Sequence, residues 1–401
     1  MPPRALALSL VALFVAACGR TPTPEAKVEV EREAEPGLDP DDQAKRACIQ
    51  ALVDDAEVEE RFVPLLRALC AESTAMAVPG VALAVVEGDE LVLHAELGVR
   101  CFGEDEPVLQ DTPFRLGSVT KTLTASLAVA ATGADEPALR PDTRVSELGN
   151  RRLPPGAEDP TLFELLRHQT RLGELDPARV VEHEGDWWRA LTITEPPPSK
   201  DPRPSRYSNT NYIVVGAMLE FMTARSYDRL LVQSLGLGPL GLHTVRADPK
   251  AAEEAGAACG HLGHDPDRHP VPVSEEFAFI PGDPSWLWPS GGAFASAEEL
   301  ARFALALGTE DAPGTAPMLE PGVPIEDPRP EFSGLDELRY GLGLRSWTLP
   351  DGARAYGHTG DSPTFHAELM FVPGERAIVL LANRGGPLPA TTLAARALLE
   401  G

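Results

Sequence analysis

Strand patterns stand at the two ends of this chain, and helical patterns fill the long stretch between them. Near the start, VALAVVEGDELVLHAELGV (residues 81–99) predicts two strands joined by a tight turn at Gly88-Asp89. Near the end, strand patterns and a closing helix follow at residues 340–347, 366–373, 376–384 and 390–400. We therefore expect an α/β (α+β) fold, in which an antiparallel sheet is flanked by helices and carries a large all-helical insertion.

Composition shifts along the chain predict its domain boundaries. We expect a signal peptide at residues 1–17, a linker at 18–44 and one folded domain at 45–401. Within that domain, the sheet-forming part covers about residues 57–135 and 336–401, and the helical part about 136–335. The linker is rich in proline and acidic residues, a composition that favours a solvated tether.

The first twenty residues, MPPRALALSLVALFVAACGR, have the pattern of an export signal. Arg4 precedes an apolar run that ends at Ala17 and is too short to span a bilayer as a mature helix. The small residues before Cys18 resemble a bacterial lipobox, in which the cysteine is lipidated. We expect an exported chain that Cys18 anchors to the bacterial cell envelope, on its periplasmic or surface side; an ordinary signal peptide with an incidental cysteine is the alternative.

The charge balance argues against a nucleic-acid partner. The formal net charge is -26, and such a surface repels DNA, RNA and anionic lipid. Four cysteines follow the signal region, and an oxidising compartment would permit disulfides between them. We favour a Cys48–Cys70 bridge between neighbouring helical segments, with buried thiols as the alternative; Cys101 and Cys259 are the other two.

The stretch LGSVTKTLTASLAVAA (residues 116–131) predicts an apolar helix with Ser118 at its start and Lys121 one turn later. Serine is a common helix cap, but such a helix start favours an acidic residue at the position of Lys121. Apolar surroundings and the helix dipole disfavour the ammonium form, so this amine can act as a base, which an arginine cannot do. Ser118 and Lys121 are therefore candidates for a nucleophile and its activating amine, and a plain cap is the alternative.

A second candidate stretch is PSRYSNTNY (residues 204–212), which stands just before an apolar helix. Tyr207 can accept a proton when a cation lies nearby, and the Asn209 amide can orient a lysine and a substrate. A loop that leads into a helix, with Tyr207 merely packed, is the alternative.

A third stretch is YGHTGDSPTFHAELMFVP (residues 356–373). Backbone amides beside His358, Thr359 and Gly360 could bind an oxyanion, and a hairpin turn is the alternative. A metal site that joins His358 and His366 lacks further ligands in the sequence pattern.

The three stretches together, in this order, resemble the serine β-lactamase and penicillin-binding-protein family. The similarity is to its class C β-lactamase-related branch, which includes esterases and D-amino-acid peptidases. The motifs are SxxK at residues 118–121, YxN at 207–209 and K/HxG at 358–360. Flanking stretches such as FRLGSVTKTLTA and SGGAFASAEELARF look like the same family, over roughly residues 75–385. The resemblance implies a β-lactamase/transpeptidase-like fold.

The resemblance also implies the roles of the candidate residues. Ser118 attacks a carbonyl and forms an acyl-enzyme, while Lys121 and Tyr207 share the proton transfers. Which of these two takes the serine proton is left open. Asn209 hydrogen-bonds Lys121 and the substrate amide.

The backbone amides of Ser118 and Asp361 are expected to form the oxyanion hole, beside the substrate-binding segment His358, Thr359 and Gly360. No metal and no organic cofactor is implied.

Three positions depart from the family pattern. Arg171, in LLRHQTRL (residues 165–172), replaces a usual glycine. Asp361 and Thr364 stand where small residues are common. His358 replaces the lysine of the β-lactamase motif, and a neutral histidine attracts a substrate carboxylate less.

These departures bear on the substrate, because Asp361 also adds a negative charge. Two like charges near 4 Å repel by about 4 kcal/mol at an effective dielectric of 20, which is an upper limit here. We therefore expect weak or no β-lactamase activity, and a better fit for a neutral ester or for an amide with a free amine.

The sequence thus predicts a lipid-anchored serine hydrolase that acts on a small-molecule ester or amide or on a cell-wall peptide. The alternative is a catalytically inactive lipoprotein of the same fold that binds cell-wall peptide or a protein partner. The pattern leaves the oligomeric state open.

Overall fold

The computed structural model describes residues 48, 58–133, 137, 139–149, 152–195, 203–263, 267, 269–278, 280, 283–312, 314–326, 332 and 334–401. The predicted signal peptide, Cys18 and the linker lie outside the described residues. Among the helices that are described, none has the length and apolar character needed to cross a membrane.

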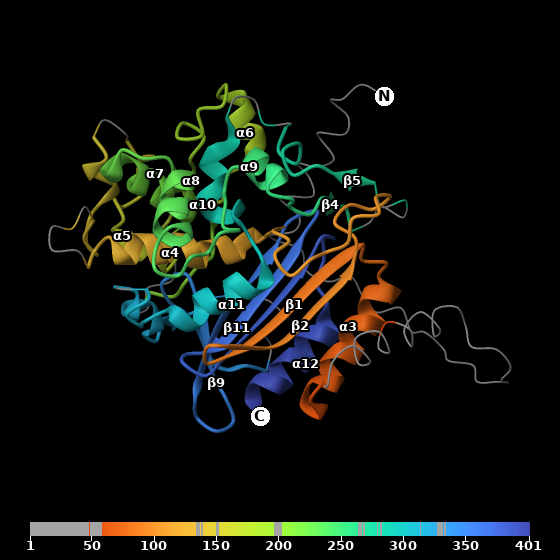
Figure 1. Cartoon of the computed structure of the whole chain (residues 1–401). Helices are drawn as coiled ribbons and strands as arrows, with labels where there is room; N and C mark the ends of the chain where they lie inside the picture. Colours follow the sequence, from red (N-terminus) through yellow and green to blue (C-terminus); the bar gives the residue numbers. More distant parts are fainter. Residues whose placement is uncertain are drawn as a thin grey trace, which may run out of the picture.

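An eight-stranded antiparallel sheet carries the fold, in the order β2-β1-β12-β11-β10-β9-β8-β7 (Figure 1). Its strands are β1 (Gly80–Glu87), β2 (Glu90–Gly98), β7 (Val323–Pro324), β8 (Asp336–Tyr340), β9 (Arg345–Thr348), β10 (Arg354–Asp361), β11 (His366–Val372) and β12 (Arg376–Ala382). Because β1 pairs with β12, the two strand-forming segments on either side of the helical region meet inside one sheet, as the sequence predicted.

Alternate side chains of β1 enter two separate hydrophobic cores, since successive residues of a strand point to opposite faces. One face packs against α3 (Val63–Ala75) and α12 (Pro389–Glu400) through Val81, Leu83 and Val85. The other face packs against α11 (Ala297–Ala306) through Ala82, Ala84 and Val86. Figure 1 shows α3 and α12 together on the side of the sheet away from the other helices.

Helices dominate the part of the chain between the sheet-forming segments. They are α4 (Thr120–Ala130), α5 (Leu162–Leu166), α6 (Pro177–Glu182), α7 (Asn209–Thr223), α8 (Tyr227–Leu231), α9 (Pro249–Glu254), α10 (Trp288–Gly291) and α11. Single turns accompany them at η1 (Glu60–Phe62), η2 (Gly117–Val119), η3 (Val145–Glu147), η4 (Val232–Gly236), η5 (Pro284–Leu287) and η6 (Ala316–Leu319).

The prediction that this insertion is all-helical was wrong in detail. The segment contributes β6 (Phe294–Ala295), which pairs with β3 (Phe114–Arg115), and it also contains the pair β4 (Gly260–His261) and β5 (Pro270–Val271). Strands of two residues are too short to produce an alternating apolar pattern, so the sequence carried no signal for them.

Two disulfides join the described cysteines. Cys48 bonds Cys70, which is the predicted pairing, and Cys101 bonds Cys259 across 158 residues of sequence. The second bridge ties the segment after β2 to the residue before β4, and so fastens the sheet edge to the inserted region.

Candidate active site

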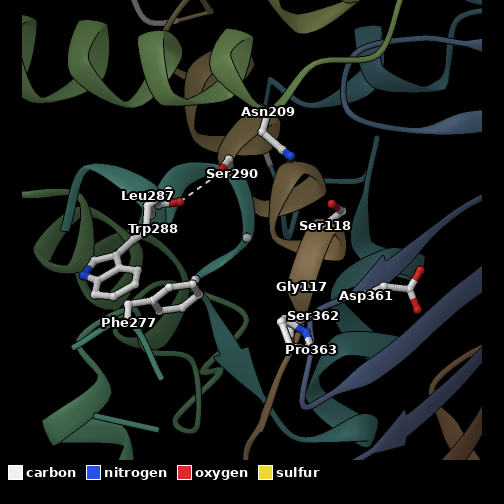
Figure 2. A pocket seen from close by; sticks show the side chains of 12 residues that line it. Gly117, Ser118, Asn209, Phe277, Leu287, Trp288, Ser290, Asp361, Ser362 and Pro363 are labelled. Atoms are coloured by element: carbon white, nitrogen blue, oxygen red, sulfur yellow. Dashed lines mark hydrogen bonds between the residues drawn. The ribbon is translucent and has the colours of Figure 1, made fainter. Parts of the chain in front are cut away.

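A cleft lies where the turn before α4 meets the end of β10. Its walls include Ser118, Asn209, Phe277, Trp288, Ser290 and Asp361 (Figure 2). Ser118 is half-buried in the 3₁₀ turn η2, and the cap of α4 is Val119. The alternative of a plain helix cap at Ser118 was therefore wrong.

Lys121 is fully buried in the first turn of α4, and its amine meets three oxygen atoms. Nζ lies 2.9 Å from Ser118 Oγ, 2.6 Å from Asn209 Oδ1 and 2.6 Å from the carbonyl oxygen of Ser290. The amide and peptide oxygens can only accept, so they take two amine hydrogens in either charge state. The remaining position on nitrogen faces Ser118 Oγ, as a lone pair or as a third hydrogen. Lys121 is thus oriented to exchange a proton with Ser118.

Asn209, the first residue of α7, is held in one orientation by partners of opposite kind. Its Oδ1 accepts from Lys121, while its Nδ2 and its backbone N–H donate to the carboxylate of Glu174 at 2.7 and 2.8 Å. Because a lysine amine held in this way offers hydrogens and a carboxylate only accepts, the amide cannot flip without losing both bonds. Sequence reasoning missed Glu174, since nothing in the pattern relates this loop residue to a helix that starts 35 positions later.

Tyr207 lies in a cluster of aromatic rings and cations. Lys121 Nζ is 5.0 Å from the centroid of its ring, and the guanidinium of Arg345 is 5.5 Å from it. The ring of His168 is 4.5 Å away, and the Tyr207 hydroxyl oxygen is buried. Both cations face the ring of Tyr207, so this phenol lies beside the amine that contacts Ser118. Arg345 and His168 were not among the predicted residues, although His168 belongs to the LLRHQTRL stretch.

His358 is 2% exposed and uses both ring nitrogens inside the protein. Nδ1 lies 2.7 Å from the carbonyl oxygen of Thr359, which can only accept, so Nδ1 carries the hydrogen. Nε2 then accepts from the Tyr340 hydroxyl at 3.0 Å. Burial first, and then the positive charges of Arg345 and Lys121, hold the pKa of His358 well below its ordinary value. The side chain is neutral, and the segment lies inside β10 rather than in a hairpin turn.

Two glycines bring the expected oxyanion amides together. Gly117 has a φ of +48°, and a Cβ there would lie 2.9 Å from the backbone nitrogen of Asp361. A Cβ at Gly360 would overlap the Leu116 carbonyl oxygen and lie 2.9 Å from the backbone nitrogen of Ser118. Only glycine lets β10 pass this close to the turn, so the amides of Ser118 and Asp361 lie on the same wall.

The Asp361 carboxylate turns away from Ser118 and toward β11 (Figure 2). It lies 2.7 Å from His366 Nδ1, and His366 Nε2 lies 3.0 Å from a carboxylate oxygen of Glu368. Burial alone would lower the pKa of His366, but Asp361 and Glu368 together raise that pKa to about 10. His366 is therefore an imidazolium at neutral pH, and it compensates the charge of Asp361. The register of β10 and β11 sets Asp361 opposite His366, and the sequence alone did not specify this register.

Arg171 and Thr364, the other departures from the family pattern, hold neighbouring segments by hydrogen bonds. Arg171 donates to the carbonyl oxygens of Thr194 and Gly156. Thr364 donates to the buried Glu276 at 2.6 Å, and Glu276 forms an ion pair with Arg115 on β3. Both sets of bonds join loops to their neighbours around the site.

This chain is similar to known proteins over most of its length. Residues 67–401 match the family model described as Beta-lactamase. Penicillin-binding protein 4 of Amycolatopsis lactamdurans is 32% identical in an alignment of 356 residues, and the match covers 83% of this chain and 86% of that protein.

Solved structures share the fold at lower sequence identity. A class C β-lactamase from Rhodobacter sphaeroides aligns with a TM-score of 0.65 and 22% identity, over 84% of this chain and 98% of that one. The D-alanine carboxypeptidase AmpC from Burkholderia cenocepacia aligns with a TM-score of 0.65 and 21% identity, over 86% and 99%. At these identities the two structures establish a shared fold alone.

Proposed function

Because this chain belongs to the β-lactamase family, we propose that it is a serine hydrolase that works through an acyl-enzyme on Ser118. The observation that carries the proposal is the 2.9 Å contact between Lys121 Nζ and Ser118 Oγ. Two carbonyl oxygens occupy the other amine positions, which points the exchangeable proton site of Lys121 at the nucleophile. A purely structural serine requires no buried lysine held in this way.

In the proposed reaction, Ser118 Oγ attacks the substrate carbonyl carbon, and its proton passes to Lys121 or Tyr207. The negative charge on the carbonyl oxygen is stabilised by the amides of Ser118 and Asp361. The bond to the leaving group then breaks, and the leaving group takes up the proton. Water attacks the acyl-enzyme by the same route and releases the acid and free Ser118.

The substrate class that we propose is an ester or an amide, esterase-like or D-amino-acid-peptidase-like. The penicillin-binding and carboxypeptidase names of the relatives support an acyl substrate related to cell-wall peptide. The neutral His358 supports weak or no β-lactamase activity, since it offers no charge to a carboxylate. The negative charge of Asp361 was the second reason to expect weak β-lactamase activity. This reason is weaker in the folded protein, because Asp361 pairs with His366.

Intact-mass measurement after treatment with a fluorophosphonate tests the proposal. We expect one covalent adduct, and we expect it to vanish in Ser118→Ala while Ser126→Ala, a serine in the helix that follows Ser118, keeps it. Absence of an adduct with the fluorophosphonate, a penicillin and a neutral ester would favour a non-catalytic binding protein. Turnover of nitrocefin faster than that of a short-chain nitrophenyl ester would contradict the proposed substrate preference.

We also propose that the chain is exported and anchored to the bacterial cell envelope through lipidated Cys18. The sequence around Cys18 supports this, and so do the two disulfides, which form and persist in oxidising compartments. Membrane fractionation of the full chain and of Cys18→Ser tests it. We expect the variant to leave the membrane fraction, and a lipid-modified N-terminal peptide in the unsubstituted protein alone.

A further inference from the structure

We propose that His366 sets the substrate charge specificity of the site, because its imidazolium neutralises Asp361 beside the oxyanion hole. By this means a carboxylate on an ester or amide substrate meets no uncompensated negative charge beside the oxyanion hole, although the neutral His358 does not attract it. The inference rests on the proposed acyl-enzyme function and names a residue and a substrate class for it.

Asp361 contributes two groups near the expected oxyanion hole. Its backbone amide is one of the two expected oxyanion donors and Asp361 lines the cleft, while its side chain, one quarter exposed, turns toward β11. Amide and carboxylate belong to one residue, so the charge lies within one side-chain length of the expected oxyanion donor. An uncompensated carboxylate there would repel an anionic substrate and also oppose the oxyanion that forms in the reaction.

His366 removes this charge by contact. The ring is 2% exposed on β11, and Asp361 of β10 and Glu368 of its own strand lie against its two nitrogens, at 2.7 and 3.0 Å. Carboxylates can only accept in their ionised form, so the ring needs a hydrogen on each nitrogen to satisfy both. The raised pKa of His366, to about 10, agrees with this geometry.

Glu368 explains how the imidazolium is retained in a buried place. Its carboxylate is 3% exposed, and it also accepts from the Thr392 hydroxyl of α12 at 2.5 Å. Glu368 therefore lies on the far side of His366 from Asp361 and is held by the helix behind the sheet. The cluster places its remaining negative charge away from the cleft.

A pair of thioester substrates that differ only in a terminal carboxylate or its methyl ester tests the inference. The readout is the ratio of kcat/KM for the anionic substrate to kcat/KM for the neutral one. In His366→Gln we expect this ratio to fall roughly tenfold, about 1.4 kcal/mol, the size expected for one uncompensated charge about 12 Å away at an effective dielectric near 20. Glutamine keeps a hydrogen-bond donor but carries no charge.

The double variant Asp361→Asn/His366→Gln should bring the ratio back to within about threefold of the unsubstituted protein, because no charge is left to compensate. His94→Gln is the matched control, since His94 also pairs with a carboxylate, that of Glu96, at an exposed place on β2. An equal fall in both kcat/KM values of His366→Gln, with no change in their ratio, would assign His366 a structural role only and overturn the inference.

Asp361→Asn alone keeps the test decisive even if His366→Gln does not fold. Removal of the carboxylate charge while the imidazolium keeps Glu368 as its partner should raise the ratio, by about as much as His366→Gln lowers it. An unchanged ratio would mean that charge at this position does not reach the substrate, and the inference would be wrong.

The charge of His366 can also be measured without catalysis, by nitrogen NMR of the Ser118→Ala chain at pH 8. We expect both ring nitrogens of His366 to carry hydrogen, and a neutral ring would overturn the inference. A protonated His366 in a chain whose Ser118 takes up no acyl probe would instead locate the failure in the proposed hydrolase function, and the substrate part of the inference would fall with it.

Discussion

His358 and His366 lie on adjacent strands and are equally buried, yet His358 is neutral and His366 is positively charged. Each is 2% exposed. Around His358 lie Arg345, Lys121 and aromatic rings, and its pKa is well below the ordinary value. Around His366 lie two carboxylates, and its pKa is about 10. Burial opposes the charged form in both places, so the neighbouring charges decide the outcome.

The site has two sides that meet at Gly360. The cationic side contains Lys121, Tyr207, Arg345 and His358, and it performs the proposed proton transfers. The acidic side contains Asp361, His366 and Glu368, and it governs the charge that the substrate meets. Each side can therefore be changed separately, and the changes below run from the largest expected effect to the smallest.

Lys121→Met removes the amine from the cationic side and should give the largest loss. We expect acylation by a fluorophosphonate and by a neutral ester to slow by about a thousandfold or more, because Ser118 loses its proton acceptor. Stopped-flow or intact-mass kinetics measure this, and Lys250→Met is the control, as an exposed lysine on α9. A loss below tenfold would shift the proton-accepting role to Tyr207.

Gly360→Ala tests the boundary between the two sides. A Cβ there would overlap the Leu116 carbonyl oxygen, so β10 must move away from the turn that holds Ser118. We expect kcat/KM for a neutral ester to fall about a hundredfold, the size of losing one oxyanion donor. Gly133→Ala, with no atom closer than 3.5 Å, should stay within twofold. Unchanged kinetics in Gly360→Ala would mean that the close approach of β10 to the turn is not needed to place the oxyanion amides.

The opposite charge states predict opposite effects of pH on stability. The pKa of His366 is higher in the folded state than the unfolded value near 6.5, so its contribution is complete below that pH and is lost as pH rises through about 10. The pKa of His358 is lower in the folded state, so its contribution is present above pH 6.5 and is lost as pH falls below it.

Urea denaturation of variants at several pH values can separate the two histidines. Relative to His366→Gln, the unsubstituted protein should lose about 2 kcal/mol of unfolding free energy between pH 7 and 9. Relative to His358→Gln, it should lose about 1 to 2 kcal/mol between pH 7 and 5. If the unfolding free energy depended on pH in the same way in both variants, the two histidines would not differ in charge.

Tyr340→Phe should give the smallest effect, because it removes one hydroxyl from the cationic side. The change leaves His358 Nε2 without its donor, and we expect a loss of about 1 kcal/mol in unfolding free energy. The kcat/KM for a neutral ester should fall less than tenfold. A much larger kinetic loss would make the Tyr340–His358 bond part of the proton-transfer path.

Regular patterns made the sheet and its long helices predictable from sequence. β1, β2, β11 and β12 each extend over at least seven residues, long enough for an apolar pattern to identify them. Ser118 and Lys121 were predictable as a pair, since residues three apart on a helix start lie on one side of it. The two-residue strands β3 to β7 offer no such period.

The partners of the candidate residues could not be predicted in the same way. Glu174 reaches Asn209, and Arg345 reaches Tyr207, only because the folded chain brings separate loops and strands together. The charge of Asp361 was visible in the sequence, but its compensation depends on the register that sets His366 beside it. The expectation that Asp361 adds an uncompensated negative charge therefore failed, because its contact with His366 decides the net charge there.

The pairing of β1 with β12 has a consequence for how this protein comes into being. Val81 is registered with Ala382, so a central strand of the sheet has no partner on one side until nearly the whole chain has been synthesised. Contacts of such long sequence separation slow folding and leave apolar strands exposed in the growing chain. The sheet and the two cores on its faces can therefore be completed only after β12 has been synthesised.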